Sequence, residues 1–357
     1  MLIPVDLGSR SYTIAVECGA LAMVGDHLRP LGLGGKAVLV SDAAIRRLYG
    51  TRVAESLTTA GFSVTELDVP EGEPAKSLAV AERCWDALLS AGIDRTSTVL
   101  ALGGGAVGDL AGFVAATYMR GVNFVQLPTT VLAQVDASIG GKTAIDHPRA
   151  KNLIGSFHQP RLVVVDPATI GSLPEREYRS GLAEMVKHGC VLDAGYFDDM
   201  ERSAAALLGR DLGHVERLIA GSCRLKARVV EQDERDAELR NVLNYGHTIG
   251  HALEAASEYQ RWTHGEAVAL GIVAEARLAH RLGEATADTV ARQRALLEAL
   301  GLPTRIEGVD PAVVLAAIKR DKKARDGRIP FVLAPEIGRF RLVTDVKDDD
   351  VLAALGA

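Results

Sequence analysis

The stretch Thr98-Val-Leu-Ala-Leu-Gly-Gly-Gly-Ala-Val-Gly-Asp109 joins a β-branched apolar run to a glycine turn and then to an apolar helical segment. Gly103, Gly105 and Gly108 have the G-x-G-x-x-G spacing, in which backbone amides at a helix N-terminus hold a pyrophosphate. The acid that usually binds the ribose is missing from the end of the next strand, and the best acid after a strand is Asp42, earlier in the chain. The stretch therefore indicates a dinucleotide site of unusual layout, or only a tight turn.

Around this stretch, the first half of the chain alternates strand and helix patterns. Strands are expected at Tyr12–Val16, Ala37–Val40, Val64–Val69, Thr98–Leu102, Phe124–Leu127 and Leu162–Val165. Helical periodicity lies between most of them, as in Ala43–Leu57 and Leu78–Leu89. Strands separated by helices predict a parallel sheet that is covered on both faces and binds ligands at the carboxyl ends of its strands.

The pattern changes near residues 170–178, after which most segments up to Lys323 have helical period. A short β-pair, Ile329–Ala334 with Arg339–Val343, is expected near the end. Single cores rarely grow beyond roughly 250–300 residues, so 357 residues suit two domains. We expect a Rossmann-like α/β nucleotide-binding domain over residues 1–173 and a mostly helical metal- and substrate-binding domain over residues 174–357.

The composition is typical of a globular protein, with 48% hydrophobic and 24% charged residues. A net charge of −6 disfavours a general nucleic-acid or membrane-surface binder. The four cysteines have no metal or redox spacing, and the N-terminus lacks the pattern of a signal peptide. The most apolar helical run, Ala267–Ala279, carries two charges and is too short for a bilayer. We expect a cytoplasmic protein without nucleic-acid or membrane partners.

Three histidines lie close together in the second half of the chain. His247 and His251 are four residues apart, so they share one face of a helix, and His264 opens the next apolar helix. Glu184, in an earlier helical Glu-x-x-Lys-His run, could add a carboxylate to a His/His/Glu metal site with one open position. The alternative is that these are ordinary helix histidines, hydrogen-bonded to carbonyls or water.

Cationic residues gather outside the periodic helices of this acidic chain. Arg120, Lys142 and Lys151 lie in stretches rich in Gly and Pro, where they could hold a phosphate or carboxylate or be ordinary surface charges. The basic run Lys319–Arg328 is either a solvated helix end or a lip over an anionic substrate. Arg240 and Asn244 are expected on the helix face of His247 and His251. The run that ends Lys142-Thr143 lacks the upstream glycine of a P-loop, which argues against an NTPase.

Taken together, these motifs resemble the 3-dehydroquinate synthase family, a group of sugar phosphate cyclases. The resemblance extends from about residue 37 to residue 335. It rests on the runs Gly103–Gly121, Pro128–Thr130, Gly140–Thr143, Lys151–Gly155, Phe157–Pro160, Ala183–Gly189, Leu243–His251 and His264–Glu266. It implies a homodimeric lyase of the shikimate pathway, which makes chorismate and the aromatic amino acids. Its substrate would be 3-deoxy-D-arabino-heptulosonate 7-phosphate, converted to 3-dehydroquinate and phosphate by transient oxidation, β-elimination, re-reduction and intramolecular aldol closure.

The resemblance also implies NAD, one zinc or cobalt ion, and a set of site residues. The metal ligands would be Glu184, His247 and His264, which leaves His251 as an active-site histidine that does not bind the metal. NAD would contact Asp42, Glu71, Gly72, Glu73, Lys76, Gly103, Gly104, Gly105, Ala106, Val107, Gly108, Asp109, Thr129, Thr130, Lys142, Lys151, Thr169, Ile170, Gly171 and Ser172. The sugar phosphate would meet Arg120, Asp136, Lys142, Lys151, Asn152, Lys187, Lys226, Arg240, Asn244, His251 and Lys322 or Lys323.

Four features depart from the family pattern. Asp146 stands where Asn is commoner, Ala150 where Gly is expected, and Asp236 where Glu is expected, while Ile170-Gly-Ser replaces a leucine–threonine pattern. Three other functions stay open: a metal-dependent NAD polyol dehydrogenase of the same superfamily, another sugar phosphate cyclase, and a binding module without catalysis. The dehydrogenase would not need cations around a phosphate, and the binding module would show no turnover.

Overall fold

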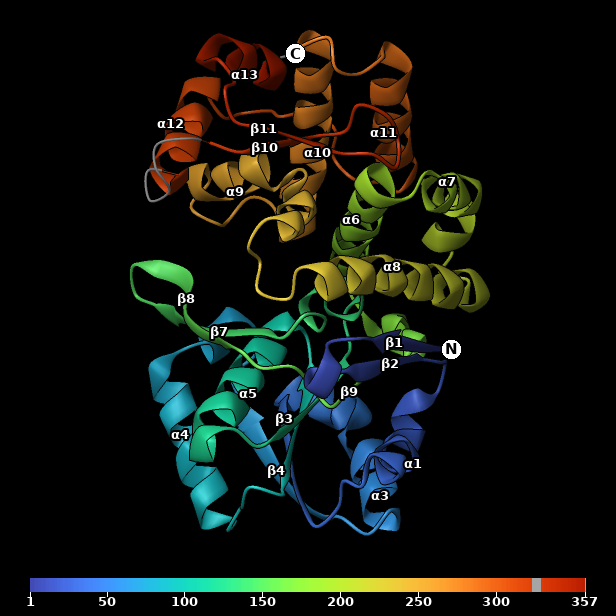
Figure 1. Ribbon diagram of the computed structural model, residues 1–357, viewed down its shortest axis with the longest axis vertical. Coiled ribbons are helices and arrows are strands. Elements are labelled where there is room, and N and C mark those ends of the chain that lie inside the picture. Colours follow the sequence, from blue (N-terminus) through green and yellow to red (C-terminus); the bar gives the residue numbers. More distant parts are fainter. Residues whose placement is uncertain (323–328, 357) are drawn as a thin grey trace. The chain divides into compact units, whose positions relative to one another are not determined.

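A computed structural model describes residues 1–322 and 329–356, the side chains of residues 321 and 322 excepted. The chain forms two compact units, coloured along the sequence in Figure 1. The first unit contains Met1–Leu173 and Lys226–Arg235, and the second contains Pro174–Leu225 and Asp236–Ala357.

The first unit is built on a sheet of seven strands. In spatial order these are β1 (Leu2–Val5), β2 (Tyr12–Val16), β9 (Leu162–Val165), β6 (Asn123–Pro128), β5 (Thr98–Gly103), β3 (Lys36–Asp42) and β4 (Ser63–Val69). Neighbouring strands are parallel, except that β1 pairs antiparallel with β2. The predicted α/β class is confirmed, and β1 is the strand of this sheet that the sequence pattern did not indicate.

Helices cover both faces of this sheet. Successive side chains of its central strands point to opposite faces, and both sets are apolar, so each face is buried under a helix layer. Val38 of β3 belongs to the core beneath α4 (Leu78–Ser90) and α5 (Gly105–Thr117). Leu39 belongs to the core beneath α1 (Val24–Leu28) and α3 (Thr51–Thr59). Figure 1 shows these two pairs of helices on opposite sides of the sheet. The helices of this unit are α1 (Val24–Leu28), α2 (Ala43–Ile45), α3 (Thr51–Thr59), α4 (Leu78–Ser90) and α5 (Gly105–Thr117).

A separate antiparallel hairpin, β7 (Lys142–His147) with β8 (Ala150–Phe157), replaces the irregular stretch that we expected there. Its first strand packs closely on α5. A Cβ added to Gly112 of α5 would lie 2.4 Å from Cγ2 of Thr143. Every residue of β8 is exposed, which is why the apolar periodicity of a buried strand is missing from its sequence.

The second unit is helical, as predicted, with one short β-pair. Its helices are α6 (Glu175–Leu192), α7 (Ala194–Leu208), α8 (Leu212–Gln232), α9 (His247–Ala256), α10 (His264–Arg281), α11 (Ala287–Ala299), α12 (Pro311–Lys322) and α13 (Asp348–Leu355). The last residues of α8 group with the first unit. Strands β10 (Phe331–Leu333) and β11 (Arg341–Val343) pair antiparallel within the expected segments. Ile249, Leu270, Val314 and Phe331 form part of its core.

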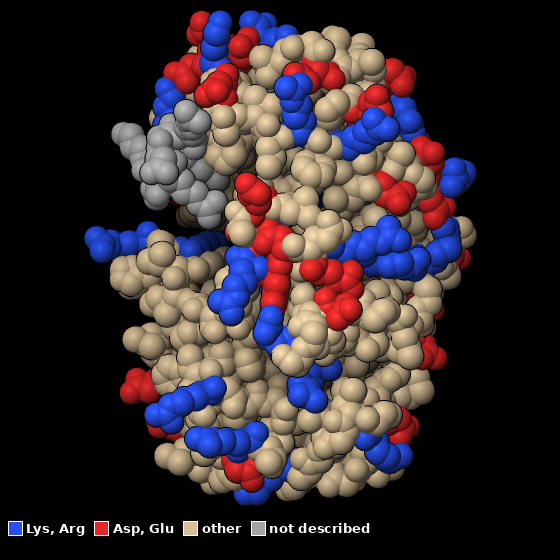
Figure 2. Space-filling view, in the orientation of Figure 1, with Lys and Arg blue, Asp and Glu red and all other residues tan. Residues whose placement is uncertain are grey.

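Charged side chains of both signs are interspersed on the face shown in Figure 2. Within the described ranges, no helix has both the length and the apolar character that crossing a membrane requires. All four cysteines are free thiols.

Candidate active site

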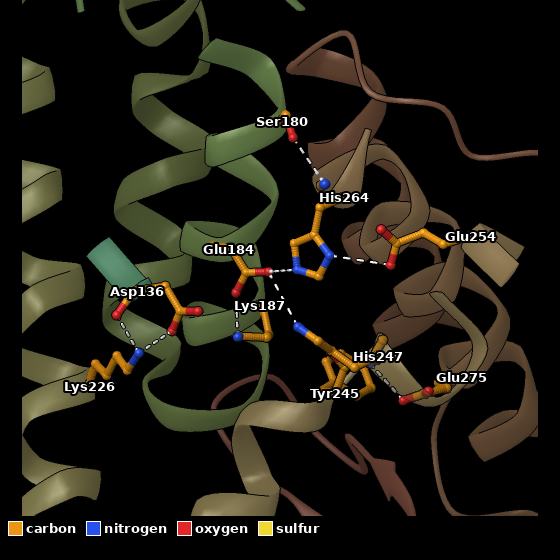
Figure 3. Close-up of polar contacts among 12 residues, drawn as sticks. Asp136, Ser180, Glu184, Lys187, Lys226, Tyr245, His247, Glu254, His264 and Glu275 are labelled. Carbon is orange, nitrogen blue, oxygen red and sulfur yellow. Dashed lines mark hydrogen bonds and ion pairs between the residues drawn. The ribbon is translucent and has the colours of Figure 1, made fainter. Parts of the chain in front are cut away.

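Three helices of the second unit bring a carboxylate and two imidazoles together (Figure 3). Oε1 of Glu184, on α6, lies 3.6 Å from Nε2 of His247 and 3.6 Å from Nε2 of His264. The two histidines are the first residues of α9 and α10. The bond lengths of a tetrahedral zinc site place its ligand atoms about 3.3 Å apart. The three atoms therefore have the separation that one small divalent ion between them would need.

The outer nitrogen of each imidazole is already engaged. Nδ1 of His247 lies 3.1 Å from the carbonyl oxygen of Tyr245, and Nδ1 of His264 lies 3.4 Å from Oε2 of Glu254. When a ring is neutral, a proton on Nδ1 that is donated to these oxygens leaves the lone pair on Nε2, the nitrogen that faces Glu184. This arrangement fits a metal site better than a pair of histidines that serve only packing.

Burial and local charge set the protonation of this cluster. Burial raises the pKa of Glu184, but the Lys187 ammonium and the two imidazoles outweigh it and hold that pKa well below its usual value. Burial and Lys187 lower the pKa of His247 well below its usual value, so its ring is neutral. Burial opposes protonation of His264 too, but Glu184 and Glu254 raise its pKa to about 10. A metal ion binding there would displace a proton from His264.

Local sequence explains why α10 begins at His264. Thr263 and Glu266 form a capping box: the Thr263 hydroxyl accepts from the amide of Glu266, and the Glu266 carboxylate accepts from the amide of Thr263. The amide of Gly265 donates to Oγ of Ser180 at 3.0 Å. A Cβ on Gly265 would lie only 1.8 Å from the carbonyl oxygen of Ser180. Glycine therefore lets α10 approach α6, which carries Glu184.

His251 completes a group of three imidazoles. Its ring centroid lies 5.2 Å from that of His247 and 5.8 Å from that of His264. One ligand nitrogen from each of the three histidines can lie within 4.8 Å of the others. Geometry thus offers two candidate ligand sets that share His247 and His264, one completed by Glu184 and the other by His251.

Arg240 and Asn244 do not lie on the helix face of the histidines, so that prediction was wrong. They belong to a separate 3₁₀ helix, Leu239–Asn244, and α9 begins only at His247. The chain is interrupted at Gly246, whose φ of +77° is left-handed. Arg240 is nevertheless buried. The side chain of Lys322 and the whole of Lys323 lie outside the described residues.

In the first unit, the predicted nucleotide-binding segments all lie at the carboxyl ends of the strands, because parallel strands end on the same side of the sheet. Asp42 ends β3, the Glu71–Lys76 loop follows β4, Gly103–Asp109 joins β5 to α5, and Thr129 and Thr130 follow β6. Thr169–Ser172 forms a 3₁₀ turn after β9. Asp42 caps α2, where its Oδ1 accepts from the amides of Ala44 and Ile45 at 2.9 Å.

The glycine turn leaves the start of α5 open to a ligand. Gly104, the N-cap of α5, has no side chain with which to cap the helix. A Cβ on Gly104 would lie 3.3 Å from Thr130, and one on Gly105 would lie 3.3 Å from Ala137. A Cβ on Gly108 would lie 2.8 Å from Gln126 on β6. Backbone amides at a helix N-terminus suit a phosphate group.

Lys76 lies at the centre of a polar cluster beside this turn. Its side chain is 4% exposed, and its Nζ lies 2.8 Å from Asp109 and in contact with Oδ1 of Asn152. Burial lowers the pKa of Lys76, but Asp109, Glu73 and Asp146 outweigh it and leave that pKa raised. Lys151 lies 3.5 Å from Glu73. Asp146, one of the departures from the family pattern, lies on β7 and accepts from the amide of Asn152 on β8 at 2.7 Å. This hydrogen bond joins the two strands of the hairpin.

The other predicted substrate residues of this unit are spread over several elements. Nζ of Lys226 donates to the carbonyl and to the carboxylate of Asp136, both at 2.5 Å. Arg120 has a left-handed φ of +68° in the turn after α5, and Lys142 is the first residue of β7. The sequence pattern did not indicate Glu254 and Ser180, which lie beside the histidines of the second unit. For Glu254, the spacing of three residues from His251 on one helix could have pointed to it.

Comparisons with known proteins match nearly the whole chain. The family models described as 3-dehydroquinate synthase N-terminal and C-terminal match residues 66–180 and 181–324. A protein of Geobacter metallireducens named 3-dehydroquinate synthase is 51% identical over 341 residues, 96% of this chain and 95% of that protein.

Two solved structures are similar over nearly their whole length. One is 2-epi-5-epi-valiolone synthase of Streptomyces hygroscopicus with NAD+ and Zn2+ bound, at 29% identity and TM-score 0.89, covering 98% of this chain and 97% of that one. The other is 2-deoxy-scyllo-inosose synthase complexed with carbaglucose-6-phosphate, NAD+ and Co2+, at 25% identity and TM-score 0.89, covering 99% of both chains.

Proposed function

The chain belongs to the 3-dehydroquinate synthase family, and we propose that it carries out the reaction of that family with NAD and one divalent metal ion. The substrate would be 3-deoxy-D-arabino-heptulosonate 7-phosphate, and the products would be 3-dehydroquinate and phosphate. The enzyme would thus be a carbon–oxygen lyase. The observation that carries this proposal is the position of Oε1 of Glu184, equally far from two imidazole nitrogens whose rings are anchored from outside.

We propose Glu184, His247 and His264 as the metal ligands. A carboxylate that is 0% exposed and faces two imidazole nitrogens is a donor set suited to zinc or cobalt. His251, beside this set, would then act on protons of the substrate. When bound, the metal supplies a Lewis acid, and NAD supplies a reversible hydride acceptor.

NAD would bind along the carboxyl edge of the sheet in the first unit. The amides of Gly104–Val107 would meet its pyrophosphate, and Asp42 stands at the end of the neighbouring strand β3. The loop of Glu71 to Lys76, the pair Thr129 and Thr130, and the turn Thr169–Ser172 lie at the same edge. Fixing the cofactor at a strand edge orients it without covalent attachment.

The cationic residues named from the sequence would hold the phosphate and carboxylate of the substrate. We propose this role for Arg120, Lys142, Lys151, Lys187, Lys226, Arg240 and Lys322 or Lys323. Asp136, Asn152, Asn244 and His251 would line the substrate beside them. Lys187 is 1% exposed and contacts Glu184. Its positive charge would therefore act on the substrate from a buried position beside the proposed metal ligand. We also propose a cytoplasmic homodimer, for which the exposed apolar residues Leu153 and Phe157 of β8 are a candidate contact.

Release of inorganic phosphate from the seven-carbon substrate tests the proposal. Purified enzyme should release phosphate, and release should stop when NAD is stripped or when the metal is chelated. Restoring each cofactor alone to its own depleted sample should restore the rate. Phosphate release that persists without NAD and without metal would refute the proposed function.

A further inference from the structure

Helix α9 begins in an unusual way for a helix that carries a metal ligand at its first position. Its N-cap is Gly246, which has no side chain, so α9 cannot cap itself. The amide of Gly246 donates instead to Oε2 of Glu275 at 2.8 Å. Glu275 belongs to α10 and is 0% exposed. A carboxylate near a helix N-terminus also interacts favourably with the helix dipole.

The same helix, α10, therefore holds both imidazole ligands proposed above. His264 and Glu275 are eleven residues apart, three helical turns, so they lie on one face of α10. His264 supplies one imidazole directly. Glu275 holds the residue that precedes His247, which supplies the other. Figure 3 shows the Glu275 carboxylate directed toward the backbone beside Tyr245 and His247.

Close backbone packing makes this contact a rigid one. Between His264 and Glu275, on the same face of α10, a Cβ on Gly271 would lie 1.9 Å from the carbonyl oxygen of Gly246 and 3.0 Å from the amide of Gly250. A Cβ on Gly250 would lie 3.1 Å from the carbonyl oxygen of Ala267. Glycines on both helices thus let the start of α9 pack directly on α10. At this short distance the Glu275 side chain can fix the position of Gly246.

The segment before His247 is held from its other side as well. The Tyr245 hydroxyl donates to Oε1 of Gln293 at 2.6 Å, and both side chains are buried. The carbonyl of Tyr245 is the oxygen that faces Nδ1 of His247. A shift of Gly246 would therefore move both the His247 backbone and the oxygen that orients its ring.

We propose that Glu275 is a positioning residue for the metal centre: its hydrogen bond to Gly246 fixes His247 relative to His264 and thereby sets the affinity for the metal. This inference rests on the proposed function, because it takes His247 and His264 as metal ligands. In this proposal Glu275 acts through Gly246 and is not itself a metal ligand. Groups that hydrogen-bond a metal ligand typically change metal affinity by about 10–100-fold, and Glu275 acts one residue before such a ligand.

Two conservative variants separate the hydrogen bond from the charge. Glu275→Gln keeps an acceptor of the same length, whereas Glu275→Asp keeps the charge but is one methylene too short to reach Gly246. Zinc affinity would be measured by competition with a chromophoric chelator, and site geometry by the visible spectrum of the cobalt-loaded protein. Val273→Ala is the matched control, because Val273 is buried on the opposite face of α10.

We expect Glu275→Asp and Glu275→Ala to weaken zinc binding by about 10–100-fold and to change the cobalt spectrum. Glu275→Gln should remain close to the parent protein in both measurements. Val273→Ala should lower the melting temperature without altering zinc affinity. Parent-like affinity and spectrum in Glu275→Asp would overturn the inference, as would a loss in Glu275→Gln equal to that in Glu275→Asp. If Glu275→Ala does not fold, the Gln and Asp pair still decides.

Hydrogen exchange in the metal-free protein separates this inference from the metal centre itself. The peptide that covers residues 245–252 should exchange faster in Glu275→Asp than in the parent or in Glu275→Gln. If the parent protein binds no zinc, the proposed metal centre fails. The exchange rates then still show whether Glu275 holds the start of α9, and unchanged rates in Glu275→Asp would refute that.

Discussion

Replacing His264 with alanine should weaken zinc binding at the proposed metal centre, whereas replacing His251 with alanine should not. Structural zinc sites with four protein ligands have apparent binding free energies of about 10–16 kcal/mol, or about 3 kcal/mol for each ligand. A loss of about 3 kcal/mol corresponds to about 10²-fold in Kd. His264→Ala should therefore weaken zinc binding by about 10²-fold, since His264 is one of the two imidazoles that lie 3.6 Å from Glu184.

The same change at the carboxylate needs a milder substitution. Glu184→Ala would leave the Lys187 ammonium, which is 1% exposed, buried without its carboxylate partner. Breaking a buried ion pair costs about 3–5 kcal/mol of stability, which would confuse the result. Glu184→Gln also removes the negative charge, but it keeps the volume and an amide oxygen that can accept a hydrogen bond from Lys187. It should weaken zinc binding to a similar degree as His264→Ala.

His251 provides the contrast within the same cluster. His251→Ala should keep the metal and slow turnover by about 10²–10⁴-fold, the range for loss of a proton-transfer group. Elemental analysis after gel filtration, together with chelator competition, measures the metal in each variant. If His251→Ala loses the metal while His264→Ala or Glu184→Gln retains it, the three-histidine set is the correct one and our ligand assignment is wrong.

Three further predictions concern packing, charge and pH. Gly265→Ala should lower the free energy of unfolding by about 1–3 kcal/mol and weaken zinc binding, because its Cβ would lie 1.8 Å from a carbonyl oxygen of α6; Gly34→Ala, with open space around it, is the control. Lys76→Met should lower the free energy of unfolding by about 1–3 kcal/mol in urea titrations, because it leaves Asp109 without its partner, and should weaken NAD binding in fluorescence titrations; no change in either would contradict the role given to Lys76. Burial lowers the pKa of His158 below its usual 6.5, so the stability from its neutral ring is full above pH 6.5 and is lost as the pH falls through the lowered value. The free energy of unfolding would be measured between pH 7.5 and 5, a range of about one unit or more around that usual pKa. It should fall less steeply with decreasing pH in His158→Gln than in the parent protein, and identical pH profiles would count against this.

The sheet was predictable because its strands are buried on both faces. A run such as Thr98–Leu102 is apolar without alternation, and this pattern is itself the sign of a parallel sheet between two helix layers. The exposed strand β8 has no such signal, and β1 is a four-residue strand at the edge of the sheet, so the sequence showed neither.

The residue types of the candidate metal site could be predicted from the sequence, but the residues that position them could not. His247, His251 and Glu184 have recognisable helical spacings, whereas Glu254 and Glu275 look like ordinary acids on amphipathic helices. Their roles depend on how α9 and α10 pack against each other, and this packing cannot be predicted from the local sequence pattern of either helix. The error at Arg240 and Asn244 has a local cause: Gly246 adopts a left-handed φ that breaks the run which we took as one helix.

In the proposed reaction, oxidation by NAD is transient within one turnover, and simultaneous measurement of phosphate and NADH tests this. Enzyme, NAD, metal and the seven-carbon sugar phosphate are mixed, and inorganic phosphate is followed together with the absorbance of NADH. We predict one phosphate released per substrate consumed while NADH stays flat in the steady state, because the hydride returns before product leaves. Accumulation of NADH in proportion to consumed substrate, without phosphate release, would contradict the claim and indicate a polyol dehydrogenase instead.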